Sequence, residues 1–113
     1  MKAFLRIMSL IFSTKSMEID ENKLTGSIAV LENAVLAFFW VGDKPKLGSL
    51  SATLPDKSSS QLLGDRDEVL TRIIGERIAS KYGGVALVST NLPRDVDSRV
   101  VLRLLNELLS DES

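Results

Sequence analysis

The stretch AVLAFFWV, residues 34–41, is apolar at every position and rich in aromatic and β-branched side chains. Such a run predicts a strand that needs burial on both of its faces. Glu32 and Asn33 predict a tight turn before it, and the segment from Gly42 to Lys46 predicts a loop after it. This strand is therefore the feature around which the remaining elements have to be arranged.

Three other segments predict half-buried strands, because their apolar and polar residues alternate with a period of two. They are residues 14–20, 24–32 and 49–54. Residues 24–32, 34–41 and 49–54 are expected to form an antiparallel meander. The positions expected to share a face are Lys15, Met17 and Ile19 in the first segment, Leu24, Ile28 and Val30 in the second, and Leu50, Ala52 and Leu54 in the third.

Helical periodicity occurs twice in the second half of the chain. Asp65, with Glu68 three positions later, resembles a capping box at the start of the first helix, and Gly83 supplies a left-handed residue to end it. Gly75 is expected to mark close packing against the sheet. The second helix is expected after Pro93, as far as about residue 109. The two apolar stripes are Leu70, Ile73, Ile74 and Ile78, and Val101, Leu104, Leu105 and Leu108.

The segments between these elements are short. Residues 55–60 are polar and predict a mobile surface loop, and residues 85–90 predict a strand between the helices. The expected fold class is α+β: an antiparallel sheet of about five to six strands, with two C-terminal-half helices packed on one face. We expect a single domain over residues 13–110, an N-terminal extension of open role at residues 1–12, and a tail at residues 111–113.

Two helices can cover only one face of this sheet, although the central run is apolar on both. The economical cover for the other face is the sheet of a partner subunit. The alternative is that Phe39, Trp40 and Val41 are all core and that residues 1–12 cover the second face. The candidate partner-binding residues are Ala37, Phe39 and Trp40, or their opposite-face neighbours Phe38 and Val41.

Composition excludes several functional classes. The 113 residues include no cysteine and no histidine, which excludes thiol nucleophiles, disulfides, histidine triads and imidazole or thiolate zinc sites. The formal charge is −1, so no global field favours nucleic acid or an anionic membrane. Asp65, Asp67 and Glu68 cluster where helix capping explains them. We therefore expect no catalytic activity, no cofactor and no metal.

The first twelve residues carry Lys2 and Arg6 among apolar residues, in a helical amphipathic pattern. Because no acidic residue occurs before Glu18, a mitochondrial presequence is one interpretation. The other two are an element packed on the domain, or a start upstream of a functional Met17. The apolar run is too short to cross a membrane.

Three stretches, in one order and at consistent separations, resemble the proteasome assembly chaperone 4 family. The resemblance covers roughly residues 24–109, while residues 1–12 match nothing in that family. The stretches are Phe39–Gly42 with Pro45, Leu47, Leu50 and Ala52; Leu62–Asp65; and Val88, Ser89, Asn91 and Leu92 with Asp97 and Ser98.

The resemblance implies a non-enzymatic chaperone of the cytoplasm, or of cytoplasm and nucleus. It would pair through apposed sheets with the third proteasome assembly chaperone, or with itself, and bind alpha-type subunits to promote correct alpha-ring assembly of the proteasome core particle. For the alpha-subunit contact we expect Asp43, Lys44 and Lys46, whose alternative role is that of solvated turn charges. The alternative function is a roadblock-like α+β dimerisation scaffold for another complex, a class that normally begins with a helix.

Overall fold

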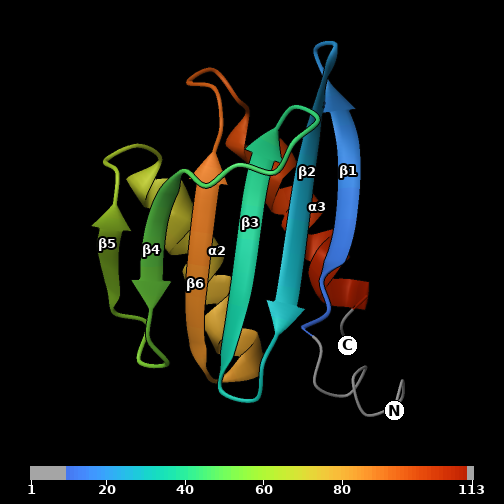
Figure 1. The fold of residues 1–113 in the computed structure, drawn as a ribbon. Coiled ribbons are helices and arrows are strands. Elements are labelled where there is room, and N and C mark those ends of the chain that lie inside the picture. Colours follow the sequence, from blue (N-terminus) through green and yellow to red (C-terminus); the bar gives the residue numbers. More distant parts are fainter. Residues whose placement is uncertain (1–9, 112–113) are drawn as a thin grey trace.

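The computed structural model describes residues 10–111, in which six strands form one sheet and two helices lie behind it (Figure 1). The expected α+β class, with both helices in the C-terminal half, is confirmed. The expectations for the N-terminal extension fall largely on residues 1–9, which lie outside the described residues. In chain order the elements are β1 (Ser13–Ile19), β2 (Asn22–Val30), β3 (Ala34–Val41), β4 (Ser49–Thr53), β5 (Ser59–Leu63), α2 (Glu68–Tyr82), β6 (Val85–Asn91) and α3 (Ser98–Asp111).

The sheet order is β1-β2-β3-β6-β4-β5, so the predicted meander is wrong at its third strand. β6 lies between β3 and β4, parallel to β3 and antiparallel to β4. Residues 42–48 carry the chain across the end of β6, where Gly48 donates its N–H to Ser89 Oγ at 3.0 Å. A Cβ at position 48 would collide with the carbonyl oxygen of Thr90. The crossing therefore depends on this glycine.

The predicted surface loop at residues 55–60 is also partly wrong. The turn is confined to residues 54–58, closed by a 2.9 Å bond from Leu54 N–H to the Ser58 carbonyl oxygen. Ser59 and Ser60 already belong to β5, the strand at the edge of the sheet. Four of the five β5 residues are exposed. Because an exposed edge strand buries few side chains, its sequence lacks the alternation of apolar and polar residues and is typical of a loop.

The core lies between the sheet and the two helices. Phe39 is fully buried there, and the ring packs so closely on β2 that a Cβ at Gly26 would lie 2.8 Å from it. Gly75 in α2 faces Thr53 of β4, and a Cβ at position 75 would overlap the Thr53 hydroxyl. The expectation that Gly75 marks close packing against the sheet is confirmed.

The helix ends agree with the sequence in part. α2 begins at Glu68 behind Asp67, which has a left-handed backbone and makes no side-chain cap bond, so the predicted capping box at Asp65 is wrong. Gly83 ends α2 with φ 72° and donates its N–H to the Ala79 carbonyl oxygen. In residues 10–111 no helix is long and apolar enough to cross a membrane.

The last helix extends further than expected. Asp111 belongs to α3 and forms an ion pair of 2.8 Å with Lys15 of β1. This contact raises the pKa of Lys15, chiefly through the hydrogen bond to the carboxylate. It ties the C-terminal end of α3 to the first strand of the sheet.

Candidate interaction surface

The sheet face that points away from α2 and α3, here called the open face, is apolar over one half. β4 shows this most clearly, because its serines and threonine point toward α2 and are buried. Leu50 and Ala52 alternate with them and point the other way, and Leu54, which follows β4, is 46% exposed. On a strand covered by helices on one side only, the apolar side chains usually face the helices and the polar side chains face water. The apolar side of β4 therefore lies on the open face, which residues 10–111 leave uncovered.

β3 contributes to both faces of the sheet. Val35, Ala37 and Phe39 belong to the core beneath the helices, with Val41 packed against it. Because side chains alternate along a strand, Phe38 and Trp40 point to the open face. The predicted grouping of Ala37 and Phe39 with Trp40, and of Phe38 with Val41, is therefore wrong.

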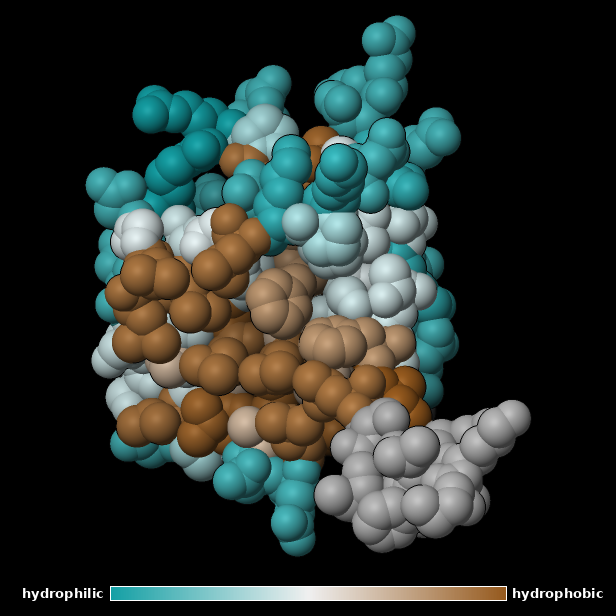
Figure 2. Space-filling view, in the orientation of Figure 1, coloured by the Kyte–Doolittle hydropathy of each residue, from teal (hydrophilic) through white to brown (hydrophobic). Residues whose placement is uncertain are grey.

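The strands around β3 extend the apolar surface with residues that sequence reasoning missed. Leu87 of β6 is in register with Leu36 of β3 and Ala52 of β4, so all three share the open face. Leu63 of β5 pairs with Leu50 and is 50% exposed. Figure 2 shows these hydrophobic side chains gathered on one continuous area of this face. We define the apolar half as Leu36, Phe38, Trp40, Leu50, Ala52, Leu54, Leu63 and Leu87.

A depression of about 430 Å³ lies on the open face beside Phe38 and Trp40. Phe12, just before β1, forms one wall, with its ring centroid 6.1 Å from that of Phe38. Pro45, from the segment that crosses β6, also lines it. Trp40 is only 7% exposed, and its indole N–H has no hydrogen-bond partner in the described residues. The depression thus offers aromatic walls and a buried donor.

The other half of the open face carries hydroxyl groups. Thr14 of β1 bonds to Ser27 of β2 at 2.8 Å, and Ser16 bonds to Thr25 at 2.9 Å. These side-chain pairs are directly opposite each other in the β1–β2 ladder. Because each of these four hydroxyls already has a partner, a second protein could cover this half without leaving them unsatisfied.

The charged residues predicted to contact a client, Asp43, Lys44 and Lys46, lie in the segment between β3 and β4. All three are exposed. Lys46 Nζ donates to the Val41 carbonyl oxygen at 3.3 Å. The segment runs along the edge of the open face (Figure 1). It therefore stands beside the apolar half rather than within it.

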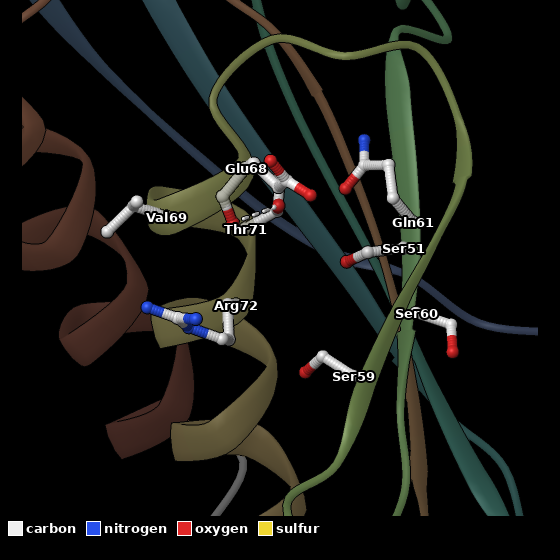
Figure 3. Close-up of a pocket in the computed structure, with 8 residues that line it drawn as sticks. All are labelled: Ser51, Ser59, Ser60, Gln61, Glu68, Val69, Thr71 and Arg72. Carbon is white, nitrogen blue, oxygen red and sulfur yellow. Dashed lines mark hydrogen bonds between the residues drawn. The ribbon is translucent and has the colours of Figure 1, made fainter.

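A second cavity, of about 230 Å³, lies on the helix side between the β4–β5 hairpin and the start of α2 (Figure 3). Its lining is polar apart from Val69, and Glu68 and Arg72 are the charged residues in it. The Thr71 hydroxyl donates to the carbonyl oxygens of Asp67 and Glu68, both at 3.1 Å, as is usual for threonine in a helix. No hydrogen bond among the lining residues joins a nucleophile to a base. Within residues 10–111, no group of three or more acidic side chains is placed to hold a metal ion.

Two exposed aspartates have altered acidity through local hydrogen bonds. The Arg99 side chain and backbone N–H lower the pKa of Asp97, at the start of α3. The Ser58 hydroxyl lowers the pKa of Asp56 in the β4–β5 turn. Both arrangements are those of a helix start and a tight turn, and they stabilise backbone structure.

Comparison with known proteins gave similarity at the level of fold. No protein-family model matches the chain, and no curated protein matches it either. Among solved structures, a chain from the crystal structure of a novel chaperone complex for yeast 20S proteasome assembly is similar, with a TM-score of 0.63 and 12% sequence identity. The similarity covers 89% of this chain and 93% of that chain. The chain therefore shares its α+β fold with a component of that yeast chaperone complex.

Proposed function

We propose that this chain is a proteasome assembly chaperone that works by binding alone. It pairs through the apolar half of its open face with the sheet of a sister chaperone, the third proteasome assembly chaperone, or with a second copy. The pair binds alpha-type subunits in the cytoplasm and promotes correct assembly of the alpha ring. Support for this proposal comes from the sequence motifs, the fold similarity and the polarity of the sheet.

The single observation that carries the proposal is the orientation of β4. Its buried hydroxyl side, which includes Ser49, Ser51 and Thr53, faces α2, and Leu50 and Ala52 face away. A monomer gains nothing from this arrangement, because it leaves apolar area in water at a cost of roughly 25 cal/mol per Å². A partner sheet about 10 Å away would recover that free energy, as in a β-sandwich.

The depression beside Trp40 supplies a natural anchor point within this surface. Interfaces concentrate their binding energy in a few buried aromatic side chains that fill well-formed pockets. We expect a side chain of the partner to enter the space between Phe12, Phe38 and Pro45. An acceptor on that side chain would satisfy the Trp40 indole N–H.

The proposed contact with alpha-type subunits uses Asp43, Lys44 and Lys46. These side chains are exposed and lie at the margin of the open face, so they remain accessible when the apolar half is covered. Charges at such a rim act mainly on the rate of association and on the choice of partner. Replacing all three with serine should weaken capture of alpha-type subunits while pairing with the sister chaperone persists.

The proposal is tested by affinity capture of the tagged full chain from native lysate, followed by mass spectrometry. We expect alpha-type proteasome subunits together with a second small chaperone, and no particles containing processed beta subunits. The Phe38→Glu variant should lose the small chaperone. The matched control is Arg103→Glu, which places the same charge on an exposed position of α3 and should leave capture unchanged.

Two results would contradict the proposal. Capture of a kinase scaffold or a motor, without proteasome subunits, would favour the roadblock-like dimerisation scaffold. Equal capture of the small chaperone by the wild type and by the folded Phe38→Glu variant would remove the open face from the interface. Circular dichroism of each variant decides whether it is folded.

A further inference from the structure

The sheet ends at β5, and the first half of this edge strand has backbone groups that can pair with another strand (Figure 1). Leu54 donates its N–H to the Ser58 carbonyl oxygen, which therefore points toward β4. Because the backbone groups of successive residues in an antiparallel strand point in opposite directions, those of Ser60 also face β4. The N–H and carbonyl oxygen of Ser59 and the N–H of Gln61 thus point to the free edge.

The second half of β5 is closed to such pairing. The register between β4 and β5 shifts between Leu50 and Ser51, which marks a β-bulge. The Gln61 side-chain amide donates to the Leu63 carbonyl oxygen at 2.9 Å. Bulges and local hydrogen bonds are common ways of preventing an edge strand from pairing. The bulge leaves the stretch from Ser59 to Gln61 regular, so a further strand could pair there.

The polar cavity of about 230 Å³ lies on the helix side of this stretch (Figure 3). Ser59 and Gln61 line it, because they are opposite Thr53 and Ser51, whose side chains face α2. Ser51 is 2% exposed, and its hydroxyl has no hydrogen-bond partner in the described residues. Figure 3 shows the Ser51 oxygen directed into the space between β4 and α2. A buried hydroxyl without a partner is rare and calls for a polar group from outside the chain.

The cavity is continued along α2 by a shallow depression of about 520 Å³. We call the two together the edge groove. Its charged lining residues are the cations Lys57, Arg72, Arg77 and Lys81 and the anions Glu68 and Glu76. Arg77 and Lys81 donate hydrogen bonds to α3, whereas Lys57 and Arg72 are exposed and form no ion pair within residues 10–111. This excess of positive charge favours an acidic ligand.

We propose that the first half of β5 and the edge groove bind an extended acidic segment of another protein by strand addition. The backbone of the segment pairs with Ser59 and Gln61, so that the segment extends the sheet beyond β5. Every second side chain of the segment then faces the helix side. Glutamates at these positions meet Lys57 and Arg72, and one of them enters the cavity that contains the Ser51 hydroxyl. The site lies outside the open face, so it is independent of pairing with a sister chaperone.

The proposal is tested with the full chain and a fluorescent peptide, slightly longer than β5, in which glutamate alternates with valine. Fluorescence anisotropy should show saturable binding that weakens as salt is added. The matched peptide with lysine in place of glutamate should not bind. N-methylation of every second peptide residue distinguishes strand addition from a purely ionic contact. Methyl groups in the register that donates to β5 should abolish binding, and methyl groups in the other register should preserve it.

Amide hydrogen exchange locates the bound peptide. Exchange at the Ser59 and Gln61 amides should slow when the glutamate peptide is added, because the peptide carbonyl groups accept from them. The Ser60 amide already faces β4, so its exchange should not change. Protection that is confined to strands of the open face would overturn the proposal.

Three variants of the chain separate the parts of the site. Arg72→Glu should weaken peptide binding about tenfold at low salt, because an attraction is replaced by a repulsion. The matched control, Arg103→Glu on α3, should leave binding unchanged. Gln61→Pro removes an N–H that points away from β4, which an edge strand tolerates, and should abolish binding. If this variant does not fold, the two N-methylated peptides still decide the question on the wild-type chain.

Two results would overturn this inference. The first is equal binding by the wild type and the folded Arg72→Glu variant, without protection at Ser59 and Gln61. The second is a self-association of the chain that Gln61→Pro abolishes while the peptide does not bind, which would assign the edge to a second copy. Phe38→Glu should retain peptide binding. Its loss of pairing, with no peptide binding in the wild type, would overturn this inference alone, and peptide binding without any sister chaperone would overturn only the proposed function.

Discussion

Phe38 and Phe39 are neighbours on β3, yet the structure predicts opposite consequences for their replacement by alanine. Phe39 is fully buried under the helices, with its ring against Gly26. Deleting it removes a complete aromatic side chain from a packed core, at about 3–5 kcal/mol of unfolding free energy. For a domain whose total stability is about 5–15 kcal/mol, Phe39→Ala should leave little folded margin.

Phe38 is only partly buried, on the open face. Fully burying a phenylalanine is worth about 1.5–3 kcal/mol, so Phe38→Ala should cost the isolated chain roughly 1 kcal/mol. Its larger effect should be on pairing, because aromatic residues near the centre of an interface carry a disproportionate share of the binding energy. A loss of 2 kcal/mol or more there, the usual threshold for such residues, corresponds to roughly thirtyfold weaker association.

Urea unfolding of each variant, followed by circular dichroism, gives the first quantity. Sedimentation with the captured partner gives the second. Equal destabilisation by the two substitutions would refute the assignment of the two faces. A Phe38→Ala variant that pairs with wild-type affinity would refute the role of the open face.

Three further outcomes follow from local packing and charge. Gly75→Ala should lower the free energy of unfolding, measured by chemical denaturation, by about 1–3 kcal/mol, because the added methyl group overlaps Thr53. This effect should outweigh the higher helix propensity of alanine. A more stable variant would contradict this packing. Gly48→Ala should lower the melting temperature, because the added methyl group would meet the end of β6, and an unchanged value would show that the crossing tolerates a side chain. Asp97→Ala should lower the melting temperature at neutral pH. Because the pKa of Asp97 is lowered from its ordinary value of 3.8, the charged carboxylate stabilises the fold at pH values above 3.8, and this contribution is lost as the pH falls through the folded pKa. The difference in melting temperature between Asp97→Ala and the wild type should therefore vanish in acid. A difference that is independent of pH would exclude the charged bond from Arg99.

Much of the fold could be predicted because its signals are local. The run at residues 34–41 forms β3 with the expected bounds, and Gly83 ends α2 as expected. The position of β6 could not be predicted in this way. Its parallel pairing with β3 joins segments far apart in sequence, and the alternation of a strand contains no information on which strand lies beside it.

The candidate surface could be predicted only in part, for a related reason. The alternation of apolar and hydroxyl side chains in β4 is plain in the sequence, but the sequence does not show which set faces the helices. Two of the three hydroxyls on this side have partners in the interior: Ser49 Oγ accepts from the Arg66 N–H, and Thr53 bonds to Ser59 at 2.8 Å. Ser51 Oγ is buried without a partner among the described residues. Small residues there also allow α2 to approach at Gly75. Only the packing shows that the apolar residues of β4 point away from the helices.

The proposed function requires that another folded chain docks on the apolar half of the open face. The most direct test places a photo-reactive amino acid at Leu54, which is exposed at the margin of this surface, and in a second variant at Arg103 on α3. After irradiation in living cells, we expect a cross-link from position 54 to a small chaperone or a second copy, and none from position 103. A cross-link to that partner from position 103 and not from position 54 would contradict it.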